Sequence, residues 1–417
     1  MRRVLLTKTR RDLRRRLGQF AAVTVTVLLG VTLFVASYDA FLNLSASYER
    51  TYGRLHLADL TATAPDARPL AAQAADADGV GAVATRTQAD LPLTITGQKL
   101  TGRVIGLPDD GGAPAVNRFD LTEGRAPAAG DEDGAVVERY AADTFGLQPG
   151  DRVRAYDGSA WRTLTVRGVA ESPEYLWPAS SRQEALTDPH SFAALYVPEP
   201  TARALAGRKA PNQVLVEFTA HTGSATEDRA TGAFRDAGAV HVEPQQDQPS
   251  NATLAEDLKG FNEIAVAFPL LFLSAAGVAS YVLLTRLVLA ERRVIGTLLA
   301  AGAARGAVVR HYLSHSVITC TAGAVPGVGA GAVATDAMTR AYTSELGIPD
   351  TVVGRHPATA LLGVAFELVV GLVAGRAGAR GGPAGSVRLS PVPGASRRAG
   401  GWRCATWAAA SAAPWPP

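Results

Sequence analysis

The sequence predicts a polytopic α-helical membrane protein with four transmembrane helices and a large mixed α/β extracytoplasmic domain between helices 1 and 2. Two observations lead to this fold class. Four apolar runs are each long enough to cross a bilayer, which takes about 20 residues of helix. Between the first and second runs lies a polar block, residues 39–263, with 32 acidic and 20 basic residues and hence a net charge of −12. A chain with this distribution is anchored in a membrane and carries one outer domain.

The four apolar runs are residues 17–38, 264–285, 313–335 and 357–375. The first three contain no Asp, Glu, Lys or Arg, and the fourth contains only Glu367. Since the first run is longer than the core of a cleaved signal peptide, which is about 7–15 residues, we expect an uncleaved anchor. A carboxyl inside a membrane is costly. Glu367 is therefore a proton or substrate site, or it faces a neighbouring helix or lies near a helix end.

Lysine and arginine decide the expected orientation, because cytoplasmic segments are enriched in them. Residues 1–16 hold eight basic residues against one acid, residues 286–312 hold five against one, and residues 376–417 hold six and no acid. The loop 336–356 holds two basic and three acidic residues. We therefore expect a multi-pass protein of the plasma membrane with cytoplasmic termini and an outer loop at 336–356. The N-terminal segment is predicted to form an interfacial helix and the C-terminal segment a disordered tail.

The polar block is predicted to fold as a mixed α/β domain with helical stalks at both ends. Two runs of alternating polarity flank the turn signal "DGS" at 157–159. Residues 192–198 and 212–218 are predicted strands, and residues 226–238 a helix. The block contains no cysteine, so an ordinary apolar core must hold it together.

The chain lacks the motifs of the common catalytic sites. None of its four lysines follows the glycine pattern of a phosphate-binding loop, and neither G-x-S-x-G nor H-E-x-x-H occurs. His311 and His315 have a spacing that allows them to share a metal ion, but interfacial histidines without a metal are the simpler interpretation. We expect no enzymatic activity, no cofactor and no metal. Nucleic-acid binding is not expected either, because the basic residues lie in the segments that the positive-inside rule assigns to the cytoplasm.

Glycines in the third run indicate helix packing. Gly323, Gly327 and Gly331 recur every four residues around Pro326. Small residues at this spacing let two helices approach closely. The alternative is the general abundance of glycine, 42 residues in the whole chain. The pattern does not identify a partner helix.

The cytoplasmic segment 286–312 has an uncharged centre flanked by arginines. Four of its residues follow the spacing of one helical face, namely Ile295, Leu298, Leu299 and Gly302. This pattern predicts a short amphipathic helix that presents a surface to a soluble partner. An ordinary cytoplasmic hairpin is the alternative.

The run "AERRVIGTLLAAGAARGAVVRHYL" resembles the signature of the FtsX/MacB-like ABC transporter permeases. Two further stretches, "RDLRRRLGQFAAVTVTVLLGVTLFVASYDAF" and "FGLQPGDRVRAYDG", are similar to actinobacterial members. Together these matches extend over roughly residues 1–390. The resemblance implies one span, a large MacB-like outer domain and three further spans. The residues that it implies for coupling to an ATPase are Glu291, Arg292, Arg293, Ile295, Gly296, Leu298, Gly302 and Arg305.

The resemblance also implies partners and a function. The expected partners are an ABC-type ATPase subunit, a second permease chain or homodimer partner, the lipid membrane and an unidentified outer substrate or protein. We therefore expect a membrane permease subunit that couples ATP hydrolysis in a separate ATPase to export or to movement of the outer domain. A membrane-anchored sensor or regulator of cell-envelope enzymes is the alternative. So is a truncated permease half, because the chain leaves the family's closing pattern after "LSP" at 389–391.

Overall fold

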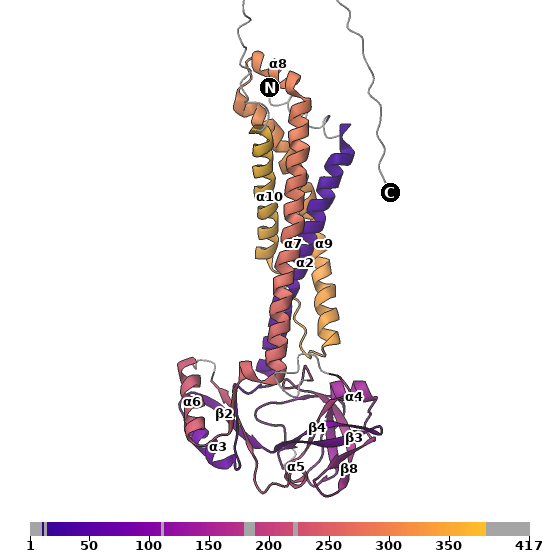
Figure 1. Ribbon diagram of the computed structural model, residues 1–417, viewed down its shortest axis with the longest axis vertical. Helices are drawn as coiled ribbons and strands as arrows, with labels where there is room; N and C mark the ends of the chain where they lie inside the picture. Colours follow the sequence, from indigo (N-terminus) through magenta and orange to yellow (C-terminus); the bar gives the residue numbers. More distant parts are fainter. Residues whose placement is uncertain (1–10, 12–14, 110–111, 179–187, 220–223, 381–417) are drawn as a thin grey trace, which may run out of the picture.

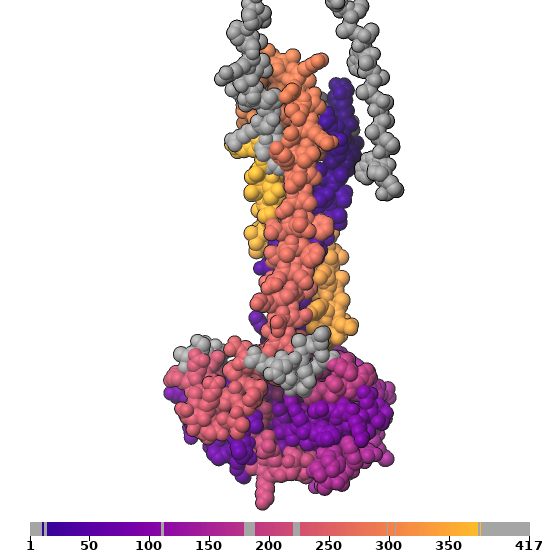
Figure 2. All heavy atoms as spheres, in the orientation of Figure 1, coloured from indigo at the N-terminus to yellow at the C-terminus, as the bar shows by residue number. Residues whose placement is uncertain are grey.

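The computed structural model describes residue 11 and residues 15–109, 112–178, 188–219 and 224–380. Within them the chain forms a long helical bundle that stands on a broader domain of strands and short helices (Figures 1 and 2). Most of the predicted interfacial helix at 1–16 lies outside the described residues. So does nearly all of the predicted tail at 376–417.

Four helices form the bundle: α2 (Leu17–Arg54), α7 (Pro249–Ala290), α9 (Arg305–Glu345) and α10 (Pro357–Arg380). Among the described residues, α2, α7 and α9 are long and apolar enough to cross a membrane, whereas the apolar part of α10, Pro357–Val373, is shorter. Three candidate spans thus agree with the predicted fold class, and the fourth stays a prediction. Apolar side chains of α2, α7 and α9 meet in the centre of the bundle, among them Val27, Val31, Leu273, Leu284 and Ala324.

The segments between the apolar runs are more helical than the sequence pattern indicates. The region 286–312 contains the end of α7, the short helix α8 (Arg292–Ala300) and the first turns of α9. The region 336–356 begins with the last turns of α9, which ends only at Glu345. Hydropathy marks where lipid surrounds a helix, but the helix itself continues until a residue or contact stops it.

The outer domain contains two sheets. The smaller one is antiparallel with strand order β11-β1-β10-β2, and α3 (Arg68–Ala75) and α6 (Ser224–Asp236) contribute to its core. Its strands are β1 (Leu60–Thr63), β2 (Val80–Arg86), β10 (Gln213–Phe218) and β11 (His241–Pro244), and the 3-10 helix η1 (Gln245–Asp247) follows. β1 and β11, which pair directly, are the strands that follow α2 and precede α7.

The larger sheet has seven strands in the order β5-β8-β6-β9-β4-β3-β7, and an additional pairing of β7 with β8 closes six of them into a barrel. The strands are β3 (Gln88–Ile95), β4 (Gln98–Leu107), β5 (Asp120–Gly124), β6 (Gly134–Glu138), β7 (Arg152–Tyr156), β8 (Trp161–Glu171) and β9 (Phe192–Pro198). The helices α4 (Arg139–Phe145) and α5 (Glu199–Leu205) follow β6 and β9. The mixed α/β prediction is confirmed, including the strand at 192–198 and the hairpin around "DGS".

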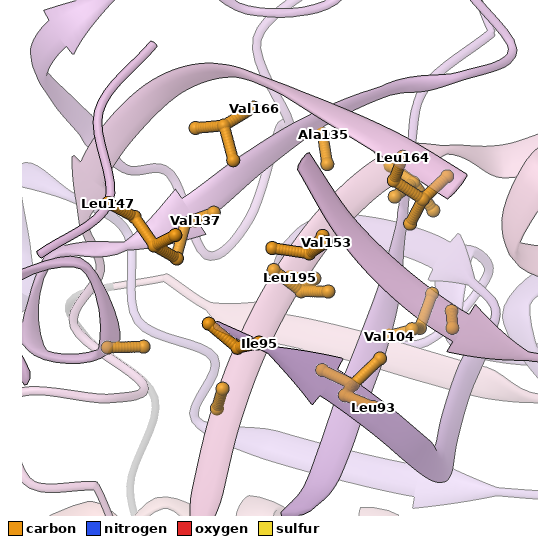
Figure 3. Packing of buried hydrophobic residues seen from close by; sticks show 14 of the residues in the cluster. Leu93, Ile95, Val104, Ala135, Val137, Leu147, Val153, Leu164, Val166 and Leu195 are labelled. Atoms are coloured by element: carbon orange, nitrogen blue, oxygen red, sulfur yellow. The ribbon is translucent and has the colours of Figure 1, made fainter. Parts of the chain in front are cut away.

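The barrel encloses the main core of the outer domain. Figure 3 shows side chains from β3, β4, β6, β7, β8 and β9 pointing toward one another, and Leu93, Val137, Val153 and Leu195 among them are fully buried. Successive side chains of a strand point to opposite faces, so every second residue of these strands enters the core.

A buried polar network joins the two sheets where β2 passes into β3. Arg86 donates to Gln213 at 2.7 Å and forms a two-point ion pair with Glu174, with N–O distances of 2.7 and 2.5 Å. Thr87, the residue between the strands, donates its N–H and its hydroxyl to the Glu199 carboxylate at 2.9 and 2.6 Å. These bonds hold the smaller sheet against the segments that follow β8 and β9 of the larger sheet, because each buried polar group would lose a partner if they separated.

Candidate functional site

α8 lies at the end of the bundle farthest from the outer domain (Figure 1). One face of α8 is attached to the bundle, since Ile295 packs against the apolar cluster of α2, α7 and α9. Tyr312 of α9 donates its hydroxyl to the Glu291 carboxylate at 2.8 Å, which ties the start of α8 to α9. Glu291 thus has a structural contact that the sequence pattern did not indicate.

The other face of α8 is open. Arg292, Arg293 and Gly296 are exposed, and the apolar side chains of Val294 and Leu299 are 41% and 38% exposed. Leu298 lies within α8, and Arg305 is the first residue of α9. The structure therefore brings the residues implied for ATPase coupling to one end of the bundle, where two arginines and two apolar side chains form an accessible surface, called here the α8 surface.

Gly302 ends α8 and does not continue its apolar face, so that part of the helical prediction was wrong. Its φ is +85°, in the left-handed region, and its N–H donates to the Leu299 carbonyl at 3.1 Å. Ala301 donates to the Thr297 carbonyl at 3.0 Å. Glycine commonly takes this position after a helix because it has no Cβ to clash there. Gly302 therefore follows the spacing of the apolar face because it caps the helix one turn later, and not because it belongs to that face.

The three glycines of α9 lie against α2. A Cβ at Gly323 would lie 2.5 Å from the Thr24 carbonyl oxygen, and one at Gly327 would lie 2.9 Å from the Leu28 carbonyl oxygen. At Gly331 a Cβ would lie 2.7 Å from Val35 Cβ. These separations are shorter than real Cβ contacts, so the two helices touch backbone to backbone only because the residues are glycines.

Polar side chains also lie between α9 and α10. Glu367 is 1% exposed and faces the Cys320 thiol, with an Oε2–Sγ distance of 3.9 Å, while Ser316 donates to the Gly371 carbonyl at 2.7 Å. Of the interpretations considered for Glu367, the structure shows the contact with a neighbouring helix. His311 and His315 are buried with ring centroids 5.0 Å apart. Within the described part of the chain, no group of three or more His, Cys, Asp or Glu could hold a metal ion.

The outer domain contains a buried carboxyl that sequence reasoning missed. Glu138 ends β6, is 5% exposed and accepts the N–H of Tyr140 at 2.7 Å, which caps α4. Burial raises the pKa of Glu138 to about 8, against the opposing effects of the Tyr140 N–H and Arg139. The available signal was the position of Glu138 directly after the apolar residues of a buried strand.

This carboxyl predicts a pH dependence of stability. An unfolded chain loses the Glu138 proton near pH 4.5, whereas the folded protein keeps it up to about pH 8. Between these values the folded state binds more protons, so its stability falls as pH rises, by at most about 1.4 kcal/mol per pH unit. Glu138→Gln should remove this contribution. Melting temperatures of the detergent-solubilised chain from pH 5 to 8 should therefore fall more steeply for the wild type than for the variant; parallel curves would contradict the prediction.

Comparisons with known proteins agree with the two-part architecture. A family model described as the MacB-like periplasmic core domain matches residues 20–233, and one described as the FtsX-like permease C-terminal region matches residues 266–380. No curated protein matches the chain.

Among solved structures, the chain is similar to the periplasmic region of MacB from Actinobacillus actinomycetemcomitans, with 14% identity and a TM-score of 0.30 over 48% of this chain and 92% of that chain. It is also similar to the extracellular domain of the ABC-type transporter YknZ from Gram-positive bacteria, with 18% identity and a TM-score of 0.29 over 44% and 89%. A domain of a putative permease from Porphyromonas gingivalis matches with 14% identity and a TM-score of 0.26 over 42% and 71%.

Proposed function

Because the chain belongs to the FtsX/MacB-like permease family, as a membrane protein with an extracytoplasmic domain, we propose that it is the permease subunit of an ABC transporter. In this role it couples ATP hydrolysis in a separate ATPase subunit to export or to movement of the outer domain. The proposal includes four spans, cytoplasmic termini and a second permease chain beside this one. The absence of a phosphate-binding loop from the sequence supports assigning ATP hydrolysis to a partner.

The observation that carries the proposal is the α8 surface. Arg292 and Arg293 beside the partly exposed Val294 and Leu299 combine charge with an apolar contact, the composition of a protein docking site. Since Ile295 and Glu291 attach the opposite face of α8 to the bundle, a force on the helix acts on α7 and α9 as well.

The continuity of α2 and α7 supports transmission to the outer domain. These helices have 38 and 42 residues, or about 57 and 63 Å at 1.5 Å per residue, and each runs from the bundle into the outer domain. They connect to β1 and β11, which pair with Leu60 opposite Pro244. Gln248, at the start of α7, also donates to the Ala58 carbonyl at 2.7 Å. A shift of α7 along α2 would therefore pull on the paired strands β1 and β11 and tilt the smaller sheet.

The test is co-purification with an ABC-type ATPase from the same genome, co-expressed with this chain. Leu299→Glu should reduce the recovered ATPase by about tenfold or more, because it places a carboxylate in a desolvated contact. The matched control is Val240→Glu, which changes a 77% exposed apolar residue of the outer domain and should leave recovery unchanged. These substitutions are cleaner than any at Gly302, where a side chain would strain the left-handed backbone.

The outcomes separate the alternatives. Equal recovery with both variants would rule out the α8 surface as the docking site. If the wild-type chain recovers no ATPase at all, the permease role fails, and a membrane-anchored sensor or regulator becomes the better description.

A further inference from the structure

A cavity of about 310 Å³ lies where the outer domain meets the outer end of α9. Among the described residues, four parts of the chain line it: α4 with the residue before it, Tyr175 and Leu176 after β8, Pro189 before β9, and the end of α9 with Gly347. In Figure 1, α4 lies directly below the outer end of α9. The outer domain and the helical bundle thus form the cavity together.

The walls of the cavity are acidic. Glu138, Asp143 and Glu345 contribute carboxyl groups, and among the described residues that line the cavity Arg139 is the only Lys or Arg. The guanidinium of Arg139 is already engaged, because it lies 2.9 Å from Glu171 and 4.0 Å from Asp143. The C-terminal end of α9 adds the negative end of a helix dipole, and the Arg139 guanidinium lies against this end, since a Cβ at Gly347 would collide with its Nη2. The electrostatic environment of this cavity therefore stabilises a bound cation.

Glu138 gives this acidic space a specific acceptor. Glu138 is buried, with 5% of the residue exposed, and one carboxylate oxygen accepts the Tyr140 N–H. The other oxygen has no hydrogen-bond partner within the described part of the chain, although Glu138 lines the cavity. A buried carboxyl with a vacant oxygen is costly as an anion unless a counter-ion accompanies it.

Charged and titratable groups from each neighbouring element bear on this carboxyl. Burial raises the pKa of Glu138 to about 8; Arg139 opposes this rise, and Glu171 and Asp143 add to it. Near pH 7 the empty cavity therefore holds a protonated Glu138, which has to release its proton before it can pair with a cation.

We propose that this cavity binds an organic ammonium group, with the Glu138 carboxylate as its counter-ion. Tyr140 and Tyr175 also line the cavity, and aromatic rings attract organic cations through their faces. Glu345 adds a second carboxylate to the cavity from the end of α9. Because α4 and α9 belong to different bodies, an occupant would also hold the outer domain against the end of the bundle.

The distance of the cavity from the membrane surface favours a ligand from the aqueous phase over a lipid headgroup. Glu345 is ten residues beyond residue 335, where the predicted third span ends, and ten residues of helix rise about 15 Å. The headgroup region adds only about 6 Å on each side of the hydrocarbon core. The inference does not rest on the proposed permease function, since it needs no ATPase.

Calorimetric titration of the full chain in nanodiscs with choline tests the proposal. The charge of choline is permanent, so any dependence on pH reports the protein. For a ligand of this size we expect saturable binding with a Kd of about 1 mM. Titrations at pH 7 in buffers of different ionisation enthalpy should show release of close to one proton on binding, and at pH 9.5 almost none. The neutral isostere of choline, with carbon in place of nitrogen, should not bind.

Two substitutions make the test specific. Glu138→Gln should weaken choline binding about tenfold or more and abolish the proton release. Glu345→Gln, at an exposed position where folding is not at risk, should weaken it about threefold. Glu256→Gln, an exposed change on α7 outside the cavity, should bind like the wild type. Absence of saturable choline binding, binding of the neutral isostere with equal affinity, or unchanged binding by both Glu138→Gln and Glu345→Gln would overturn the proposal.

Discussion

Arg86→Ala is expected to destabilise the outer domain by about 3–5 kcal/mol, because it leaves the Glu174 carboxylate buried without its cation. The side chains of Arg86 and Glu174 are only 7% and 10% exposed, and the pair joins the two sheets. Gln213 would lose a hydrogen bond to Arg86 as well. Chemical unfolding of the full chain in detergent, followed by near-UV circular dichroism, measures the loss.

The chain contains a matched control for this prediction. Arg68 and Asp66 form an ion pair at the same distance of 2.5 Å, but their side chains are 65% and 40% exposed. Water screens such a pair, so Arg68→Ala should destabilise the outer domain far less than Arg86→Ala. Replacing Arg86 and Glu174 together by Met and Leu should recover most of the loss, because no charge then remains buried. Similar effects of Arg86→Ala and Arg68→Ala would show that burial of the junction pair is not what stabilises it.

Gly323→Leu is expected to disrupt the packing of α2 on α9, with a loss at or above the usual overpacking cost of about 1–3 kcal/mol. A Cβ at Gly323 would lie 2.5 Å from the Thr24 carbonyl oxygen and 2.9 Å from Val27 Cβ. The carbonyl oxygen belongs to a helix backbone and cannot rotate away, so the helices must separate. The melting temperature and the yield of monodisperse protein in detergent should both fall.

Gly329→Leu is the control in the same helix. Gly329 is exposed, and a Cβ there would have no atom within 4 Å outside its own helix. Leucine at an exposed position of a membrane helix faces lipid, so the change in stability should be less than about 0.5 kcal/mol, and the melting temperature should stay within about 1 °C of the wild type. If both variants lose stability equally, loss of glycine itself, and not the contact with α2, would explain the effect of Gly323→Leu.

Local patterns predicted the features that depend on short stretches of chain. The apolar runs within α2, α7 and α9 were identified because partition into lipid depends on about 20 consecutive side chains. The hairpin of β7 and β8 was identified because alternation and the "DGS" turn lie within one continuous segment. Gly302 is the counterexample: its spacing matched a helical face, but its backbone conformation is that of a cap.

The sequence by itself thus determined the membrane-protein class, the position of the outer domain and the glycine repeat of α9. Only the tertiary structure decided that these glycines meet α2, that Arg86 pairs with Glu174 beyond the end of β8, and that Glu138 lines a cavity closed by α9. The physical reason is the range of the interactions. Hydropathy and turn preference act between neighbouring residues, whereas these three contacts join residues more than eighty positions apart, whose meeting depends on how the whole chain packs.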